Sequence, residues 1–145
     1  MKEKVFILGG SGMLGQELVS LFRSIPKYEV IAPSHKEVDV TNTESLKDML
    51  HELRPRYIIN AVAYNAVDLC EDSDEEYEKA LILNRDVPRE LAEISRNTSS
   101  TFVHYSTDYV FGDNEVLPGG LREDTIPRPN SRYGVSKYLG EQAAL

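Results

Sequence analysis

Short apolar runs alternate along this chain with longer stretches in which apolar residues recur every three or four positions. The runs suit buried strands, and the longer stretches suit helices that bury one face. The predicted strands cover residues 5–8, 29–32, 57–60 and 101–105, and the predicted helices cover 13–25, 41–53, 75–96 and 131–145. Strands and helices that alternate in this way are typical of an α/β fold with a parallel sheet.

Prolines and capping residues place several boundaries between these elements. Thr41 and Glu44 have the spacing of a capping box at the start of the second helix, and Pro55 stops that helix. The piece at 37–40 is expected to be extended and to form an edge strand. Pro88 lies inside the third predicted helix and is expected to kink or break it.

The last part of the chain has a different character. Residues 106–130 show no helical or strand period and hold three prolines, and a loop of this length is usually functional. The final helix reaches residue 145 with no glycine cap and no basic last turn. Because another strand normally follows such a helix in a doubly wound parallel sheet, we expect the sheet to be truncated before its last strands.

Composition and charge exclude several classes of protein. The chain has 145 residues, 41% hydrophobic and 28% charged, which suits one globular domain. Its net charge of −8 argues against a nucleic acid or an acidic membrane as partner, because both bind basic surfaces. No apolar stretch is long enough to span a membrane, and the first one is too short for a signal peptide. Cys70 is the only cysteine, so a reducing, cytoplasmic location is expected.

Much of the excess negative charge lies in an acidic run at 71–76. Acidic side chains at the start of a helix complement its dipole, so the run is interpreted as a solvated helix start. A metal site is the less favoured alternative, because no histidine accompanies the run.

Three glycines follow the first strand with the spacing G-x-x-G-x-x-G, at Gly9, Gly12 and Gly15. Glycine at such positions lets the backbone turn tightly and approach a ligand closely. The helix that follows presents unpaired N–H groups and the positive end of its dipole, which suits the pyrophosphate of a dinucleotide. Met13 and Leu14 lie in its first turn and belong to the same candidate cofactor site. The alternative is a tight strand-to-helix turn that binds nothing.

Tyr133 and Lys137 form a Y-x-x-x-K motif at the start of the last predicted helix. Helical positions four apart share a face, so the phenol and the ammonium can point into one cavity. The nearby cation would lower the pKa of Tyr133 and make its phenol a usable proton donor near neutral pH. The alternative is an exposed pair, since tyrosine and lysine occur four apart by chance in many helices.

Two strand ends carry further candidates, because ligands of open α/β sheets bind outside the carboxyl ends of the strands. Thr107 follows the last predicted strand, where its hydroxyl could hold a substrate carbonyl or else cap the next turn. Small residues follow the third strand, at Ala61, Val62 and Ala63. They could let a cofactor pass close to the backbone, or else serve only tight packing.

These motifs together have the order and relative spacing of the extended short-chain dehydrogenase/reductase superfamily, and the chain resembles its dTDP-4-dehydrorhamnose reductase family. The most specific string is S-T-D-Y-V-F at 106–111, and the segments 39–42, 60–68 and 133–137 also carry the resemblance. It covers nearly all of this chain but only the N-terminal half of a typical member. The resemblance implies that residues 1–145 form an NAD(P)-binding Rossmann domain with the catalytic residues, and that the C-terminal substrate-binding domain is absent.

The activity that the resemblance implies is NADPH-dependent reduction of the C4 keto group of a dTDP-4-keto-6-deoxy sugar, in nucleotide-sugar and polysaccharide biosynthesis. Tyr133 would donate a proton to the keto oxygen as hydride arrives from the nicotinamide. Lys137 would bond the nicotinamide ribose and lower the pKa of Tyr133, and Thr107 would orient the carbonyl. A homodimer is possible, and the isolated chain is expected to show little or no turnover, because half of the substrate pocket is missing.

Cofactor contacts follow from the same resemblance. They are Gly9, Gly12, Met13, Leu14 and Gly15 at the pyrophosphate, Asp39 and Val40 at the adenine, Ala61, Val62 and Ala63 along the groove, and Tyr64 toward the nicotinamide or the substrate. For Asp39, the alternative is a residue that only starts the next helix.

The residues after the second strand bear on the 2′ position of the cofactor. Sites that prefer NAD usually place an acid there to hold the ribose hydroxyls. This chain has Ser34, His35 and Lys36 instead, with no acid before Glu37, which favours a 2′-phosphate and hence NADPH, with NADH as an alternative. His35 and Lys36 could equally be ordinary loop surface.

Some relatives hold Mg²⁺ between subunits through a glutamate on the first helix, and Glu17 is so placed. Its partner ligands would lie in the missing half, so no metal is predicted for this chain. Two other functions stay open on the same fold. One is a nucleotide-sugar epimerase or dehydratase, which recycles its hydride, and the other is a non-catalytic regulatory subunit that binds NAD(P).

Overall fold

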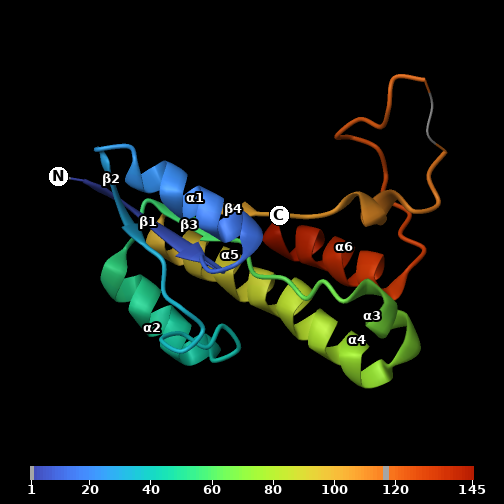
Figure 1. Cartoon of the computed structure of the whole chain (residues 1–145), viewed down its shortest axis with the longest axis horizontal. Coiled ribbons are helices and arrows are strands. Elements are labelled where there is room, and N and C mark those ends of the chain that lie inside the picture. Colours follow the sequence, from blue (N-terminus) through green and yellow to red (C-terminus); the bar gives the residue numbers. More distant parts are fainter. Residues whose placement is uncertain (1, 116–117) are drawn as a thin grey trace.

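A parallel β-sheet with helices on both faces organises the molecule (Figure 1). The structure, a computed structural model, describes residues 2–115 and 118–145, so part of the predicted 106–130 loop lies outside the described residues. The described strands are β1 (Glu3–Leu8), β2 (Tyr28–Ile31), β3 (Tyr57–Asn60) and β4 (Thr101–His104). They lie in the order β2-β1-β3-β4, and every neighbouring pair is parallel. The prediction of a Rossmann-like α/β fold with a parallel sheet is confirmed.

The helices alternate with these strands along the chain. In the described residues they are α1 (Met13–Arg23), α2 (Thr43–Leu53), α3 (Val67–Asp72), α4 (Asp74–Leu81), α5 (Val87–Thr98) and α6 (Arg132–Ala144). A π-helical turn, η1 (Ile82–Asp86), joins α4 to α5, and a short 3-10 helix, η2 (Asp108–Phe111), follows β4. The sequence predicts neither α3 nor η2. No helix in the described part of the chain is long and apolar enough to cross a membrane.

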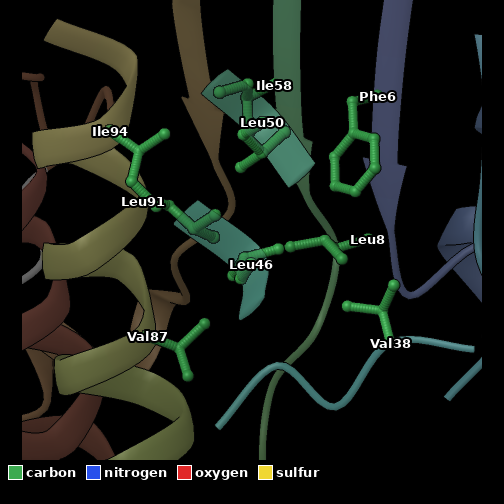
Figure 2. Packing of buried hydrophobic residues seen from close by; sticks show 9 residues of the cluster. All are labelled: Phe6, Leu8, Val38, Leu46, Leu50, Ile58, Val87, Leu91 and Ile94. Carbon is green, nitrogen blue, oxygen red and sulfur yellow. The ribbon is translucent and has the colours of Figure 1, made fainter. Parts of the chain in front are cut away.

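Alternate residues of β1 face opposite sides of the sheet, and helices cover each side. Phe6 and Leu8 point into a cluster built with α2 and α5, which Figure 2 shows from close by. The buried members of this cluster are Phe6, Leu8, Val38, Leu46, Leu50, Ile58, Val87, Leu91 and Ile94. On the other side, Val5 and Ile7 pack with Ile59 against α1. The run from 5 to 8 is continuously apolar because this strand is buried on both faces.

The predicted edge strand at 37–40 is wrong. The backbone N–H groups of Glu37 and Val38 both donate to the Ser34 carbonyl, at 3.0 Å, so the chain turns there. Val38 is nevertheless buried and points toward Phe6 and Leu8 (Figure 2). A turn can therefore bury an apolar residue, which an alternating pattern of hydrophobicity does not reveal.

The predicted capping box at the start of α2 is also wrong. The Thr41 hydroxyl donates to Asp39 Oδ1 at 2.7 Å, so it does not cap the helix. Asn42 is the N-cap, and its side-chain oxygen accepts from the backbone N–H of Ser45 at 3.2 Å. The helix begins at Thr43 because asparagine is an equally good cap one residue further on.

The long helix predicted at 75–96 exists as one rod made of α4, η1 and α5 (Figure 1). Pro88 does not break it, because the proline lies in the first turn of α5, directly after the π-helical turn. A proline ring has no N–H for the carbonyl four residues earlier, at Asn84, and a π turn relieves that mismatch. At the other end Ser73 caps α4, and Asp74, Glu75 and Glu76 lie in its first turn, so the predicted acidic helix start is confirmed for these three residues. The prediction is wrong for Glu71 and Asp72, which end α3.

Candidate active site

The glycine turn between β1 and α1 leaves no room for a side chain at Gly9 or Gly15. Gly9 has a φ of 77°, and a Cβ on it would lie 2.8 Å from the Ala61 carbonyl carbon and oxygen. A Cβ on Gly15 would collide with the Gly9 carbonyl oxygen. Gly12 donates its N–H to that same oxygen at 2.9 Å. The glycines therefore hold β1, α1 and the segment after β3 in direct backbone contact.

Two cavities meet at this turn and form one groove at the carboxyl ends of β1 and β3. The smaller measures about 210 Å³ and the larger about 420 Å³, and Gly9, Ser11 and Val62 line both. The strand order reverses beside β1, because β2 lies on one side of it and β3 on the other. Open α/β sheets bind ligands at such a reversal, so the groove is the candidate site.

The amino end of α1 opens into the larger cavity. Gly12 is the N-cap, and among the described residues no side chain caps this helix and no acid lies in its first turn. The first N–H groups of a helix need partners from outside it. Gly12, Met13 and Leu14 line the cavity, so these groups lie at its wall. The negative oxygens of a pyrophosphate fit such a helix end.

The smaller cavity contains the residues predicted for the adenine. Asp39 and Val40 both line it. Asp39 Oδ1 accepts hydrogen bonds from the Thr41 hydroxyl at 2.7 Å and the Thr41 N–H at 2.9 Å, which hold the pKa of the carboxyl below its usual value. Asp39 is therefore a fixed, ionised acceptor at this end of the groove.

Of the three residues predicted for a 2′-phosphate, the structure brings only His35 to the wall of the cavity. The backbone N–H and the hydroxyl of Ser34 both donate to Glu37 Oε2, at 2.8 Å each. These bonds lower the pKa of the Glu37 carboxyl. The donors of Ser34 that were expected for a phosphate therefore already hold a carboxylate, and Lys36 does not line either cavity.

At the other end of the groove, Tyr133 and Lys137 are buried side chains on one face of α6. Tyr133 is 7% exposed and Lys137 is 3% exposed, and both line the larger cavity, so the alternative of an exposed pair is wrong. The Lys137 ammonium donates to the Tyr105 carbonyl at 2.6 Å. The Tyr133 hydroxyl donates to Asn65 Oδ1 at 3.3 Å.

Burial sets the protonation of both groups. It raises the pKa of the Tyr133 phenol, and a hydrogen bond with Thr107 acts in the opposite direction. It lowers the pKa of the Lys137 ammonium, against a weaker opposite effect of Glu141. The predicted lowering of the Tyr133 pKa is therefore wrong for this structure. The phenol keeps its proton at neutral pH and can act as a proton donor.

Thr107 lies beside this pair at the N-cap of η2. Its hydroxyl accepts from the backbone N–H of Tyr109 and donates to Asp108 Oδ1, both at 3.3 Å. The Thr107 side chain also lowers the pKa of the Tyr133 phenol, against the larger effect of burial. Ser106, rather than Thr107, lines the larger cavity. Thr107 thus both caps the next turn and faces the tyrosine.

The predicted role of Tyr64 is wrong. Its hydroxyl donates to Glu76, a bond that raises the pKa of the phenol to about 12, and Tyr64 lines neither cavity. Its backbone N–H donates to Asn84 Oδ1 at 2.8 Å, and Asn84 Nδ2 donates to the Ser136 hydroxyl at 3.0 Å. Tyr64 is therefore held away from the groove, and buried Asn84 ties its backbone to α6 between Tyr133 and Lys137.

The small residues predicted along the groove are where the sequence places them, since Ala61, Val62 and Ala63 line the larger cavity. Sequence reasoning missed Ser11, Asn65, Tyr105 and Ser106 as wall residues of this cavity. Ser106 carries a usable signal, because it is a polar residue just beyond the end of β4. Nothing local marks Tyr105, which contributes its backbone carbonyl.

The described residues hold no group of three or more histidine, cysteine, aspartate or glutamate side chains that could bind a metal ion. The donor set of the groove consists instead of backbone N–H groups, hydroxyls, an amide and an ammonium. Such a set suits a nucleotide and a carbonyl substrate.

The sheet, the glycine turn at its reversal and the buried tyrosine–lysine pair define a class, the Rossmann-like domain of the dehydrogenase/reductase type. A model of the family described as RmlD substrate binding domain matches residues 3–145. The chain belongs to this family.

Individual relatives agree with this membership. The chain is 40% identical over 140 residues to a probable dTDP-4,6-dihydroxy-2-methyloxan-3-one 4-ketoreductase of Streptomyces antibioticus, covering 96% of the chain and 45% of that protein. It is 35% identical to the dTDP-4-dehydrorhamnose reductase of Aggregatibacter actinomycetemcomitans, covering 98% of the chain and 47% of that protein. The crystal structure of dTDP-4-dehydrorhamnose reductase from Bacillus anthracis in complex with NADP superposes with a TM-score of 0.89 at 35% identity, covering 99% of the chain and 49% of that structure. The chain thus spans about half the length of the relatives it matches.

Proposed function

We propose that this chain is the cofactor-binding and catalytic part of an NADPH-dependent reductase acting on the C4 keto group of a dTDP-4-keto-6-deoxy sugar, in nucleotide-sugar and polysaccharide biosynthesis. The observation that carries the proposal is the buried pair Tyr133 and Lys137, which lines the same cavity as the glycine turn. Relatives named as reductases of such sugars, one of them in complex with NADP, support it.

The groove fits a dinucleotide in one orientation. The smaller cavity, with Asp39 and Val40, would take the adenosine end, and the open amino end of α1 would take the pyrophosphate. The nicotinamide would then lie in the larger cavity, along Ala61 to Ala63 and beside Tyr133. NADPH is the proposed cofactor and NADH the alternative. Reduced nicotinamide supplies a hydride, and the protein has to supply the proton.

Tyr133 is the group placed to give that proton. As the keto carbon takes up hydride, negative charge develops on the keto oxygen, and the phenol transfers its proton there to complete the alcohol. Its raised pKa means that the proton is present before the reaction. Thr107, whose side chain acts on the pKa of the phenol, would hold the keto oxygen in line. Lys137, whose side chain lines the same cavity, would bond the nicotinamide ribose and so hold the cofactor beside Tyr133.

The test is a Tyr133→Phe substitution in the intact protein, assayed with NADPH and a dTDP-4-keto-6-deoxy sugar. We expect kcat to fall by about 10² to 10⁴, the usual contribution of a positioned proton donor. NADPH binding, measured by calorimetric titration, should persist. Tyr138→Phe, on the same helix but with its hydroxyl bonded to Gln142, is the matched control and should keep wild-type kcat. Normal turnover in Tyr133→Phe contradicts the proposed mechanism.

The same assay separates the other functions. A reductase consumes NADPH in proportion to product, whereas an epimerase or dehydratase recycles its hydride and shows no net consumption. A regulatory subunit would bind NADPH without turnover. Within the proposal the enzyme acts in the cytoplasm and as a homodimer, and sedimentation of the intact protein tests the oligomeric state.

A further inference from the structure

The start of α6 is capped from a different element. The Ser131 hydroxyl accepts the N–H of Gly134 at 3.0 Å, which leaves the first two N–H groups of the helix. Both go to one carboxylate oxygen, Glu71 Oε1, which accepts from Arg132 N at 2.7 Å and from Tyr133 N at 3.4 Å. Glu71 lies at the end of α3, so a negative charge from α3 sits on the positive end of the α6 dipole.

The Arg132 side chain, at the start of α6, makes further contacts with α3 and α4. Its Nη1 lies 2.7 Å from Asp74 Oδ1 and 3.4 Å from the Cys70 carbonyl oxygen. Its guanidinium also lies over the Tyr77 ring, 5.2 Å from the ring centre. Figure 1 shows α3 and α4 beside the start of α6, where these contacts form. Residues of α3 and α4 thus hold Arg132, the residue before Tyr133, in place.

The opposite end of α3 reaches the hydroxyl of the same tyrosine. Asn65 Oδ1 accepts the Tyr133 hydroxyl, and the Asn65 carbonyl accepts the N–H of Val67, which opens α3. Cys70, in the middle of the helix, packs against Tyr133 in one buried cluster. One short helix with its flanking residues therefore holds Tyr133 by its backbone, its ring and its hydroxyl.

We propose that Glu71 is a positioning residue for Tyr133, acting through the first turn of α6. This inference rests on the proposed reductase function. Ala61, Val62, Ala63 and Asn65 line the cofactor groove, and the chain then leads into α3, so α3 sets the tyrosine relative to the groove wall. Proton transfer depends steeply on such placement, because a shift of about 1 Å can cost a hundredfold in rate. Glu71 lines neither cavity, so its effect reaches the substrate only through Tyr133.

The variants for the test are Glu71→Ala and Glu71→Gln in the intact protein. Glu71→Ala removes the acceptor and should lower kcat by about tenfold, with NADPH affinity unchanged. Glu71→Gln keeps an acceptor oxygen and should recover part of the rate. Asp72→Ala is the matched control, because Asp72 is an exposed neighbouring acid on α3 that makes no hydrogen bond to α6 among the described residues. It should behave as the wild type.

A double-mutant cycle separates positioning from general destabilisation. If Glu71 acts by placing the phenol, Glu71→Ala should have no further effect on kcat when Tyr133→Phe has already removed the hydroxyl. An equal loss of kcat in both backgrounds overturns the proposal, because it would show an effect that does not pass through the proton donor.

An exchange measurement tests the contact without any activity. The backbone N–H groups of Arg132 and Tyr133 should exchange with solvent faster in Glu71→Ala than in the wild type and in Asp72→Ala. Unchanged exchange overturns the proposal. If the wild type has no reductase activity while this exchange does change, the proposed function fails and the positioning of Tyr133 by Glu71 stands.

Discussion

At the scale of single residues, the Glu37 carboxylate lies in the turn after β2, which is the place proposed for the 2′-phosphate of NADPH. It takes both donors of Ser34, and these bonds lower its pKa, so it is anionic at neutral pH. A carboxylate next to a 2′-phosphate opposes binding through like charge. In the proposed binding mode, His35 at the cavity wall would face the phosphate together with this negative charge.

We predict that Glu37→Gln strengthens NADPH binding by about fivefold, because it removes a like charge from the turn proposed for the 2′-phosphate. NADH lacks the 2′-phosphate, so its affinity should stay within about twofold. Calorimetric titration of the intact protein with each cofactor measures both. Glu52→Gln, which removes an acid from α2 away from the turn, is the control. Equal changes for the two cofactors would mean that Glu37 does not lie near the 2′ position.

The candidate site was predictable where its chemistry is local in sequence. The glycine spacing and the Tyr133–Lys137 pair need only the period of a turn and a helix. Gly9 and Gly12 line the groove, as does the Tyr133–Lys137 pair. Tyr64 could not be predicted, because its direction depends on Glu76 and Asn84, which lie on α4 and η1. The sign of the Tyr133 pKa shift failed for a similar reason, since burial is a tertiary property.

At the scale of elements, the glycines of the turn serve two different purposes. One is the packing of the fold, and the other is access of a ligand to the amino end of α1. Gly15 is needed by the fold, because a Cβ there collides with the Gly9 carbonyl oxygen. Gly12 has an ordinary φ of −75°, and a Cβ on it would lie 3.3 Å from the same oxygen, a contact that a small shift relieves. Its missing side chain matters instead to whatever approaches the amino end of α1.

Alanine substitutions should therefore have different effects at these two positions. Gly15→Ala should lower the free energy of unfolding by about 1–3 kcal/mol, the usual cost of overpacking. Gly12→Ala should keep the wild-type unfolding free energy within about 1 kcal/mol and weaken NADPH binding by about tenfold. Denaturant unfolding and calorimetric titration measure the two quantities. Equal destabilisation by both substitutions would contradict the separation.

Most elements were predictable because their apolar residues recur with a clear period. The irregular pieces depend instead on which hydrogen bonds the polar side chains make. The four strands and the rod of α4 and α5 appear within a few residues of the predicted places. The turn at 37–40 and the cap of α2 do not, because local hydrogen bonds decide them. Ser34 donates to the Glu37 carboxylate and accepts two backbone N–H groups, and Thr41 donates to the Asp39 carboxylate. Helix α3 has six residues, too few for a helical period to show.

At the scale of the whole molecule, His104 links stability to pH. It ends β4, where its Nδ1 lies 3.2 Å from Asn60 Nδ2. An amide NH₂ can only donate, so Nδ1 must accept and the ring is neutral. Burial, with a smaller effect of the Lys137 charge, lowers the pKa of His104 from 6.5 to about 4. Asn60 in turn accepts the N–H of Val62 at the floor of the groove.

The unfolding free energy should fall as the pH falls from 6.5 toward 4. In that range the unfolded chain takes a proton on His104 and the folded protein does not, and the difference amounts to about 3 kcal/mol at most. Below pH 4 both states are protonated and this contribution becomes constant. Urea unfolding at several pH values measures the slope. His104→Gln cannot titrate and should show a shallower slope, and an identical slope would assign the effect to other groups.

The π-helical turn η1 determines how α4 and α5 are rotated relative to each other about the axis of the rod. Residues of α4 face α3 and α6 near the tyrosine, whereas Leu91 and Ile94 of α5 face the sheet. Each residue of an α-helix turns the chain by about 100°, so removing one residue from 82–86 would swing one of these faces into solvent. The segment should accept many substitutions at its exposed positions, but its length is fixed. An insertion or deletion there would leave the rod intact but turn one of its two ends away from its partner, which is either the hydrophobic core or α6.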